Sequence, residues 1–310
     1  MNNLKKIGLT ALAGSLVAST AYAGALSVSG SAGVKYQSKS GSSGASSVQG
    51  NPWSDSNGIT FSGGGEMDNG MTVGVSYTMT DAAFSTSNVT LDMGDAGKLA
   101  FGHDSAHGGI DTIKDKMPTA GEEAWDDHGS GDDAGVTDVG ADASLYYSVN
   151  MSGITASASY ARTGLGTDNS IALVASELVD GAEFGIGTAT NVISATSEDD
   201  MMTVYGKYTS GPITFGVQLS EIDKTAADSD VDREAAAISF AVNENLSISY
   251  GISTVKYEAS TSVDAESNGF SASYTMGGMT VGAVRNTTDS FGGSSGTDRE
   301  FTEVSLSFAF

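Results

Sequence analysis

The chain has 310 residues with 38 acidic and 14 basic side chains, which gives a formal net charge of −24. This acidity argues against a nucleic-acid partner, because phosphate contacts require clustered Lys and Arg. The absence of cysteine excludes disulfides, zinc–thiolate sites and thiol catalysis. No apolar run reaches the ~20 residues that a helical membrane span requires.

The start of the chain predicts a signal peptide. Lys5 and Lys6 form a basic leader, an apolar stretch covers 7–17, and Ala21-Tyr22-Ala23 supplies an A-x-A cleavage site. The apolar stretch is too short to cross a bilayer, so the pattern indicates export rather than a membrane anchor. We therefore expect a signal peptide at 1–23 and one mature domain at 24–310.

From residue 25 onward, apolar residues alternate with small polar ones. The alternation is clearest at 26–36, 71–79, 154–160, 213–219 and 304–310. A period of two is typical of strands with one apolar face. The other face is mostly Ser, Thr and Gly, which helices disfavour and strands tolerate.

Sixteen segments carry this strand pattern. In chain order they are 25–39, 58–67, 71–80, 87–93, 98–103, 142–150, 153–162, 169–177, 182–190, 201–209, 213–222, 233–242, 246–257, 266–276, 279–288 and 299–310. Links of two to four residues, several with glycine, alternate with longer links such as 104–141 and 191–200.

This arrangement predicts an all-β fold, a 16-stranded antiparallel transmembrane β-barrel. An even strand number, strands of about ten residues and short turns at one end are typical of such barrels. A soluble β-sandwich is the alternative, but it would have comparable loops at both ends. The uncharged Ser, Thr and Gly face suits a wide, water-filled lumen.

Four motifs resemble the general-diffusion porins of Gram-negative outer membranes, most closely the 16-stranded alphaproteobacterial porins. They are the first-strand segment 25–36, the Lys98–Asp104 segment before the long loop, the Gly-x-Thr-x-Gly strand starts such as 70–74, and the Phe-terminated segment Val304–Phe310. The resemblance implies an outer-membrane homotrimer in contact with lipid and lipopolysaccharide. It also implies that the third long loop folds inward as a constriction.

The sequence departs from that family in one respect. Many such porins carry an arginine cluster on the wall that faces the acidic loop. Here the early strands offer few cations, and the second strand contains Gly63-Gly64-Gly65. The resemblance therefore gives no basis for a strong transverse field across this pore.

The long loop at about 104–141 is the main candidate for function, because it is much longer than a hairpin needs. Its pore-constriction candidates are acidic: Asp104, Asp111, Asp115, Glu122, Glu123, Asp126 and Asp127. Acidic side chains that line a pore favour cations over anions. Solvated loop charges without contact to the pore are the alternative interpretation.

Three lysines are candidates for basic residues of the pore wall. Strand parity places Lys35 and Lys207 in the lumen, and Lys39 follows the same parity nearer the outer mouth.

We expect no dedicated metal site, although loop carboxylates suit calcium. The weak calcium candidates are Asp126, Asp127, Asp132 and Asp133. Their spacing does not match an EF-hand.

The function predicted from the sequence is a cation-preferring channel for passive diffusion of small hydrophilic solutes, with no cofactor. An outer-membrane hydrolase is disfavoured, because all three histidines lie in or beside the long loop. A channel selective for one nutrient class and a structural or adhesive surface barrel with a plugged lumen remain as alternatives.

Overall fold

The structure is a computed structural model that describes residues 26–41, 51–81, 83–103, 108–126, 135–136 and 143–310. It contains sixteen antiparallel strands in one closed sheet. The first eight are β1 (Ser27–Gly41), β2 (Trp53–Glu66), β3 (Thr72–Thr80), β4 (Ala83–Asp92), β5 (Lys98–His103), β6 (Ser144–Met151), β7 (Ile154–Arg162) and β8 (Thr167–Ala175). The others are β9 (Ala182–Ser194), β10 (Ser197–Ser210), β11 (Ile213–Lys224), β12 (Val231–Ala241), β13 (Leu246–Tyr257), β14 (Ala265–Met276), β15 (Met279–Asp289) and β16 (Arg299–Ala309).

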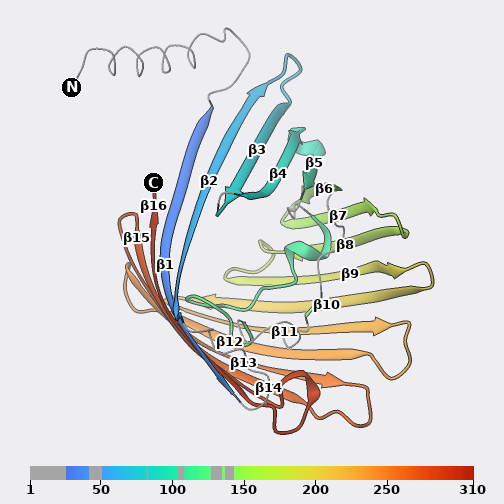
Figure 1. Cartoon of the computed structure of the whole chain (residues 1–310). Coiled ribbons are helices and arrows are strands. Elements are labelled where there is room, and N and C mark those ends of the chain that lie inside the picture. Colours follow the sequence, from blue (N-terminus) through green and yellow to red (C-terminus); the bar gives the residue numbers. More distant parts are fainter. Residues whose placement is uncertain (1–25, 42–50, 82, 104–107, 127–134, 137–142) are drawn as a thin grey trace.

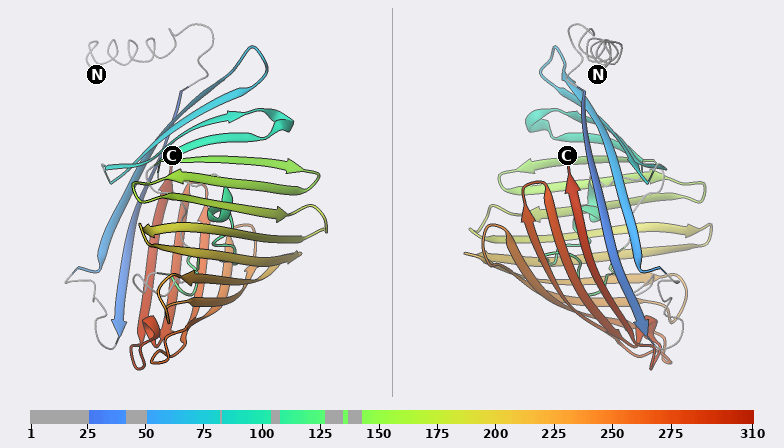
Figure 2. Two further views of the ribbon diagram at one scale, coloured as in Figure 1. Left: turned by 90° about the vertical axis from the view of Figure 1, so that its right-hand side faces the viewer. Right: turned by 60° about the vertical axis from the view of Figure 1, so that its left-hand side comes forward.

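Each strand pairs with its neighbours in sequence, and β1 pairs with β16 to close the barrel (Figure 1 and Figure 2). The predicted fold class is therefore confirmed. Three short 3₁₀ turns, η1 (Gly94–Ala96), η2 (Gly109–Thr112) and η3 (Phe291–Gly293), interrupt the connections. Within the described ranges, no helix has the length and apolar character needed to cross a membrane.

Alternation along each strand separates an outer apolar face from an inner polar one. On β11, Phe215, Val217 and Leu219 are exposed on the outside, whereas Gln218 and Ser220 are buried on the inside. Successive side chains of a strand point to opposite faces, so this one pattern produces both surfaces. An outward apolar band is the surface that a lipid bilayer requires.

Several of the short turns contain glycine, as the sequence predicts. Gly153 and Gly277 adopt φ values of +87° and +61°. This left-handed region is costly for residues with a Cβ, so glycine suits these positions. The turns they form connect β6 to β7 and β14 to β15.

The expected long link at 191–200 is wrong. β9 continues to Ser194 and β10 begins at Ser197, so the connection is a tight hairpin. Polar residues continue the ladder here, and the Thr190 hydroxyl donates to Asp200 Oδ1 at 2.7 Å. The apolar alternation ends before β9 and β10 end, because the polar residues at the tip of this hairpin lie beyond the outer apolar surface of the barrel.

Candidate functional site

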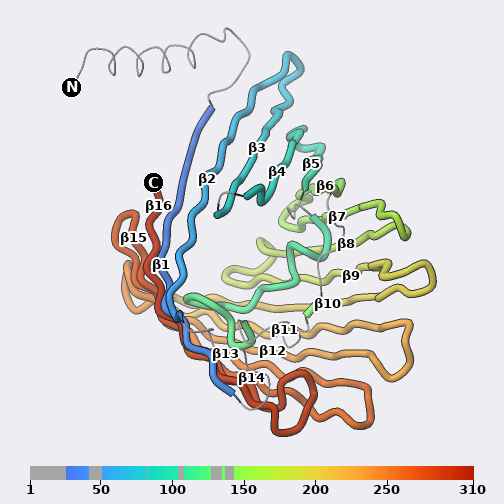
Figure 3. The backbone as a smooth tube through the Cα atoms, in the orientation of Figure 1, coloured from blue at the N-terminus to red at the C-terminus, as the bar shows by residue number. Residues whose placement is uncertain are grey.

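Residues 108–126 of the long loop lie inside the barrel (Figure 3). The segment starts beside β7 and β8, where the N–H of Gly109 donates to Ser157 Oγ at 3.0 Å. The N–H of Ile110 donates to Ser170 Oγ at 2.9 Å. Gly109 has φ +68°, and a Cβ at this position would lie 1.9 Å from Ser170 Oγ. Only glycine fits this entry point.

Gln218 on β11 holds the middle of the loop. Its Nε2 donates to the carbonyl oxygens of Ile113 at 2.9 Å and Lys114 at 3.0 Å. Its Oε1 accepts from the N–H of Lys116 at 3.2 Å. Gln218 is fully buried, so one side chain satisfies three backbone groups that water cannot easily reach.

The far part of the loop is fixed by β13 and β15. The N–H of Ala120 donates to Ser249 Oγ at 2.9 Å. Asn286 Nδ2 donates to the carbonyl oxygen of Glu123 at 2.7 Å. The loop therefore crosses the lumen along the wall from β7 to β15.

An apolar face of the loop packs against the same wall. Ile110, Ile113, Met117 and Trp125 are buried with lumen-facing residues of β8 to β12. The guanidinium carbon of Arg233 lies 4.2 Å from the centre of the Trp125 ring, which is a cation–π contact. The lumen thus contains a small hydrophobic core that fixes the loop.

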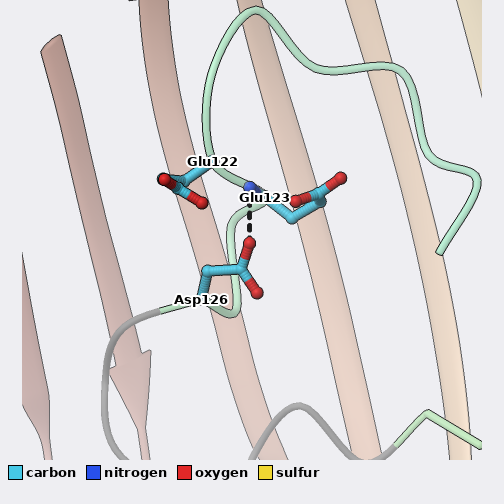
Figure 4. Close-up of side chains that lie close together, drawn as sticks. All are labelled: Glu122, Glu123 and Asp126. Carbon is cyan, nitrogen blue, oxygen red and sulfur yellow. Dashed lines mark hydrogen bonds between the residues drawn. The ribbon is translucent and has the colours of Figure 1, made fainter. Parts of the chain in front are cut away.

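A cluster of carboxylates lies on this fixed loop. One carboxylate oxygen from each of Glu122, Glu123 and Asp126 lies within 4.8 Å of the others (Figure 4). The N–H of Glu123 donates to Asp126 Oδ2 at 3.1 Å. Burial raises the pKa of Glu123 to about 9, and the Asp126 side chain and the Asp115 charge act in the same direction. Glu123 therefore holds a proton at neutral pH.

The other acidic candidates are not members of this cluster, although the charge of Asp115 acts on Glu123. Asp111 is buried beside the loop entry, and Asp115 is exposed. Asp104, Asp127, Asp132 and Asp133 lie outside the described residues, so Asp126 alone represents the calcium candidates in the structure. The three clustered carboxylates are the group with metal-ligand spacing in the part of the chain that the structure describes.

The three candidate wall lysines all contact lumen-facing partners. Lys35 Nζ lies 3.3 Å from Glu303 Oε2, and Lys207 Nζ lies 3.1 Å from Glu183 Oε1. Lys39 Nζ lies 5.2 Å from the centre of the Phe301 ring. Neither glutamate was predicted as a site residue, although both have the inward parity of their strands. Glu183 lies directly across from Lys207 in the strand register, and Glu303 lies diagonal to Lys35.

The wall formed by β1 to β3 carries small hydroxyl side chains. Thr60 and Thr78 are hydrogen-bonded to each other at 3.0 Å, and Asn88 of β4 donates to Ser76 at 2.6 Å. A recess of about 390 Å³ borders Ser31, Ser56, Thr60 and Thr78. The recess itself is therefore lined by uncharged groups, several of which can form hydrogen bonds.

A closed barrel with an apolar exterior, a polar interior and a loop fixed inside defines a membrane channel with a narrowed lumen. A family model described as Gram-negative porin matches residues 8–310, so the chain belongs to the Gram-negative porin family. It is therefore an outer-membrane channel for diffusion and not an enzyme, as the sequence predicts.

Solved porin structures share the fold at low sequence identity. An anion-selective porin from Comamonas acidovorans has a TM-score of 0.69 at 13% identity, covering 92% of this chain and 99% of that chain. OmpT of Vibrio cholerae has a TM-score of 0.68 at 13% identity, covering 93% and 98%. A variant of the Rh. blastica porin has a TM-score of 0.66 at 14% identity, covering 92% and 100%. No match was found among curated protein sequences.

Proposed function

We propose that the channel passes small hydrophilic solutes and prefers cations, with residues 104–141 as its constriction. The observation that carries this proposal is the pair Glu122 and Asp126, which lies beside the protonated Glu123 on a loop fixed inside the lumen. Carboxylates that border a narrow aqueous path attract cations and repel anions. The low dielectric of the surrounding wall strengthens that field.

The wall lysines support the same preference. Lys35 and Lys207 each lie within ion-pair distance of a glutamate, so their charges are largely compensated at short range. These two lysines therefore add little uncompensated positive charge to the lumen. The anion-selective Comamonas porin shares only 13% identity with this chain, so its selectivity is no guide here.

Planar-bilayer recordings in a potassium chloride gradient test the proposal. We expect a reversal potential of cationic sign, which falls toward zero in the double variant Glu122→Gln, Asp126→Asn. The matched control is Asp95→Asn, a carboxylate in the short turn η1 outside the lumen cluster. A reversal potential of anionic sign in the unmodified protein would overturn the proposal.

We also propose that the mature protein begins after Ala23 and assembles as a homotrimer. The order of basic leader, apolar stretch and small residues supports the cleavage, and family membership supports the trimer.

The intact mass of the membrane-extracted protein tests the proposed cleavage after Ala23. A native mass measurement in detergent tests the proposed homotrimer. A monomeric mass under conditions that preserve the barrel would contradict it.

A further inference from the structure

A second polar recess lies between the constriction loop and the wall, away from the acidic cluster. It has a volume of about 420 Å³. The loop contributes Lys116 and Thr119, and the wall contributes Glu183, Lys207, Thr214 and Ser239. These wall residues lie near the β10–β11 turn, so the recess faces the end of the barrel that carries the short turns. Short turns mark the periplasmic end of such barrels.

Two ammonium groups and one carboxylate border this recess. The carboxylate is already bound: Glu183 Oε1 accepts from the Tyr205 hydroxyl at 2.7 Å and lies 3.1 Å from Lys207 Nζ. Lys207 and Glu183 side chains are 25% and 30% exposed, so they are reachable from the lumen. Glu183 offsets one of the two positive charges, which leaves a local excess of one.

Lys116 carries that excess. Within the described ranges its ammonium forms no ion pair. Burial lowers the pKa of Lys116 below its ordinary value; Glu183 opposes this change, and Lys207 reinforces it. A bound anion would recover part of the solvation that Lys116 has lost.

The backbone at Lys116 is held in place before any ligand arrives. Its N–H donates to Gln218, and the next residue, Met117, is buried in the lumen core. A side chain that extends from a fixed backbone loses less freedom on binding than one on a mobile loop.

We propose that this recess binds the carboxylate of small zwitterionic solutes, with Lys116 as the principal contact and Lys207 and the hydroxyls of Thr119, Thr214 and Ser239 around it. A free anion is repelled by a molecule of net charge −24, whereas a zwitterion enters without net charge. Pro118 and Thr119 border both this recess and the space beside Glu122 and Glu123. These two residues therefore separate the recess from the acidic cluster on the same loop.

This inference rests on the proposed passage of small solutes. A pair of isomeric solutes distinguishes failure of the recess proposal from failure of the proposed passage. β-Alanine is a zwitterion and lactamide is its uncharged isomer, so size is matched. Swelling rates of liposomes that contain the protein give the ratio of β-alanine to lactamide permeation. If lactamide does not permeate, the proposed passage of small solutes fails; if it does, the ratio tests the recess.

We expect Lys116→Gln to lower that ratio about threefold, the size of a partly exposed ion pair. Glu183→Gln should raise it, because the recess then gains positive charge. The control is Lys35→Gln, which removes the same charge from β1 at a position paired with Glu303. Potassium chloride conductance of each variant verifies an intact pore. The inference is overturned if Lys116→Gln leaves the ratio unchanged, or if Lys35→Gln lowers it equally.

Discussion

At the scale of single residues, the position of the constriction depends on a few buried amides. Gln218 binds three backbone groups of the loop and also donates to Thr203 Oγ1 at 2.9 Å. Each buried polar group left without a partner costs about 1–3 kcal/mol. Gln218 is therefore the main side chain of the wall that forms hydrogen bonds with the backbone of residues 113–116.

Gln218→Leu should therefore release the middle of the loop without opening the barrel. We expect larger and noisier single-channel conductance, with unchanged heat-modifiable mobility of the folded barrel on gels. The matched control is Gln37→Leu on β1, where the amide donates to Glu303 and not to the loop. Conductance traces of Gln218→Leu that match those of the unmodified protein would contradict this role.

Glu123 gives the pore a pH dependence with a definite sign. Its pKa is raised to about 9, first by burial, so the side chain is neutral below that pH and negative above it. Cation preference should therefore increase between pH 7 and pH 10, which reversal potentials measure. Lysines also lose charge near the upper limit, so the increase must be compared with that of Glu123→Gln. Equal increases in both proteins would exclude Glu123 as the cause.

At the scale of elements, the entry of the loop depends on its first turn. Gly109 combines a positive φ with contact against Ser170. Gly109→Ala should displace η2, because alanine is strained in this backbone conformation and its Cβ has no space. Increased conductance and faster proteolysis within 108–126 are the expected results. Gly296→Ala is the control, since Gly296 has φ +73° but nothing within 4 Å of its Cβ position; an equal effect there would refute the argument from close contact.

The strands were more predictable than the loop. Alternation of apolar and small residues predicts which way Val217 and Gln218 face, because the period of a strand is two. The same alternation could not predict where β9 and β10 end, since Asp199 and Asp200 pair beyond the apolar band. The resemblance to porins implied an inward loop, and its acidic composition indicated the cluster.

The path of the loop along the wall was not predictable from the sequence. Its anchors, Gln218, Ser249 and Asn286, lie far apart in sequence and look like any other polar residue of inward parity. One signal was present: Ile110, Ile113 and Met117 are large apolar residues in a segment rich in acidic and polar side chains, and they are part of the buried face. Large apolar residues in a polar loop indicate that the loop packs against another part of the protein.

At the scale of the whole molecule, the barrel has its apolar surface outside and a small core inside. Val217 is 54% exposed near the middle of β11, where it would contact lipid. Val217→Arg should lower the free energy of unfolding from a bilayer by about 2–4 kcal/mol, the cost of arginine near the bilayer midplane. Urea unfolding in lipid vesicles measures this. Ser56→Arg, which faces the lumen on β2, should cost less; a larger cost there would contradict the assigned faces.

The seam between the first and last strands also determines the order in which the barrel is completed. The N–H of Gly30 donates to the carbonyl of Phe310 at 2.7 Å, and the N–H of Phe310 donates to Gly30 at 2.9 Å. All other neighbouring strands are consecutive in the chain, so each of their pairings closes a shorter loop than the seam does. The seam joins residues from opposite ends of the chain and has the largest closure entropy. Until it forms, β1 and β16 present unpaired edges that can pair with other chains. Closure of the seam is thus the step at which folding competes with aggregation.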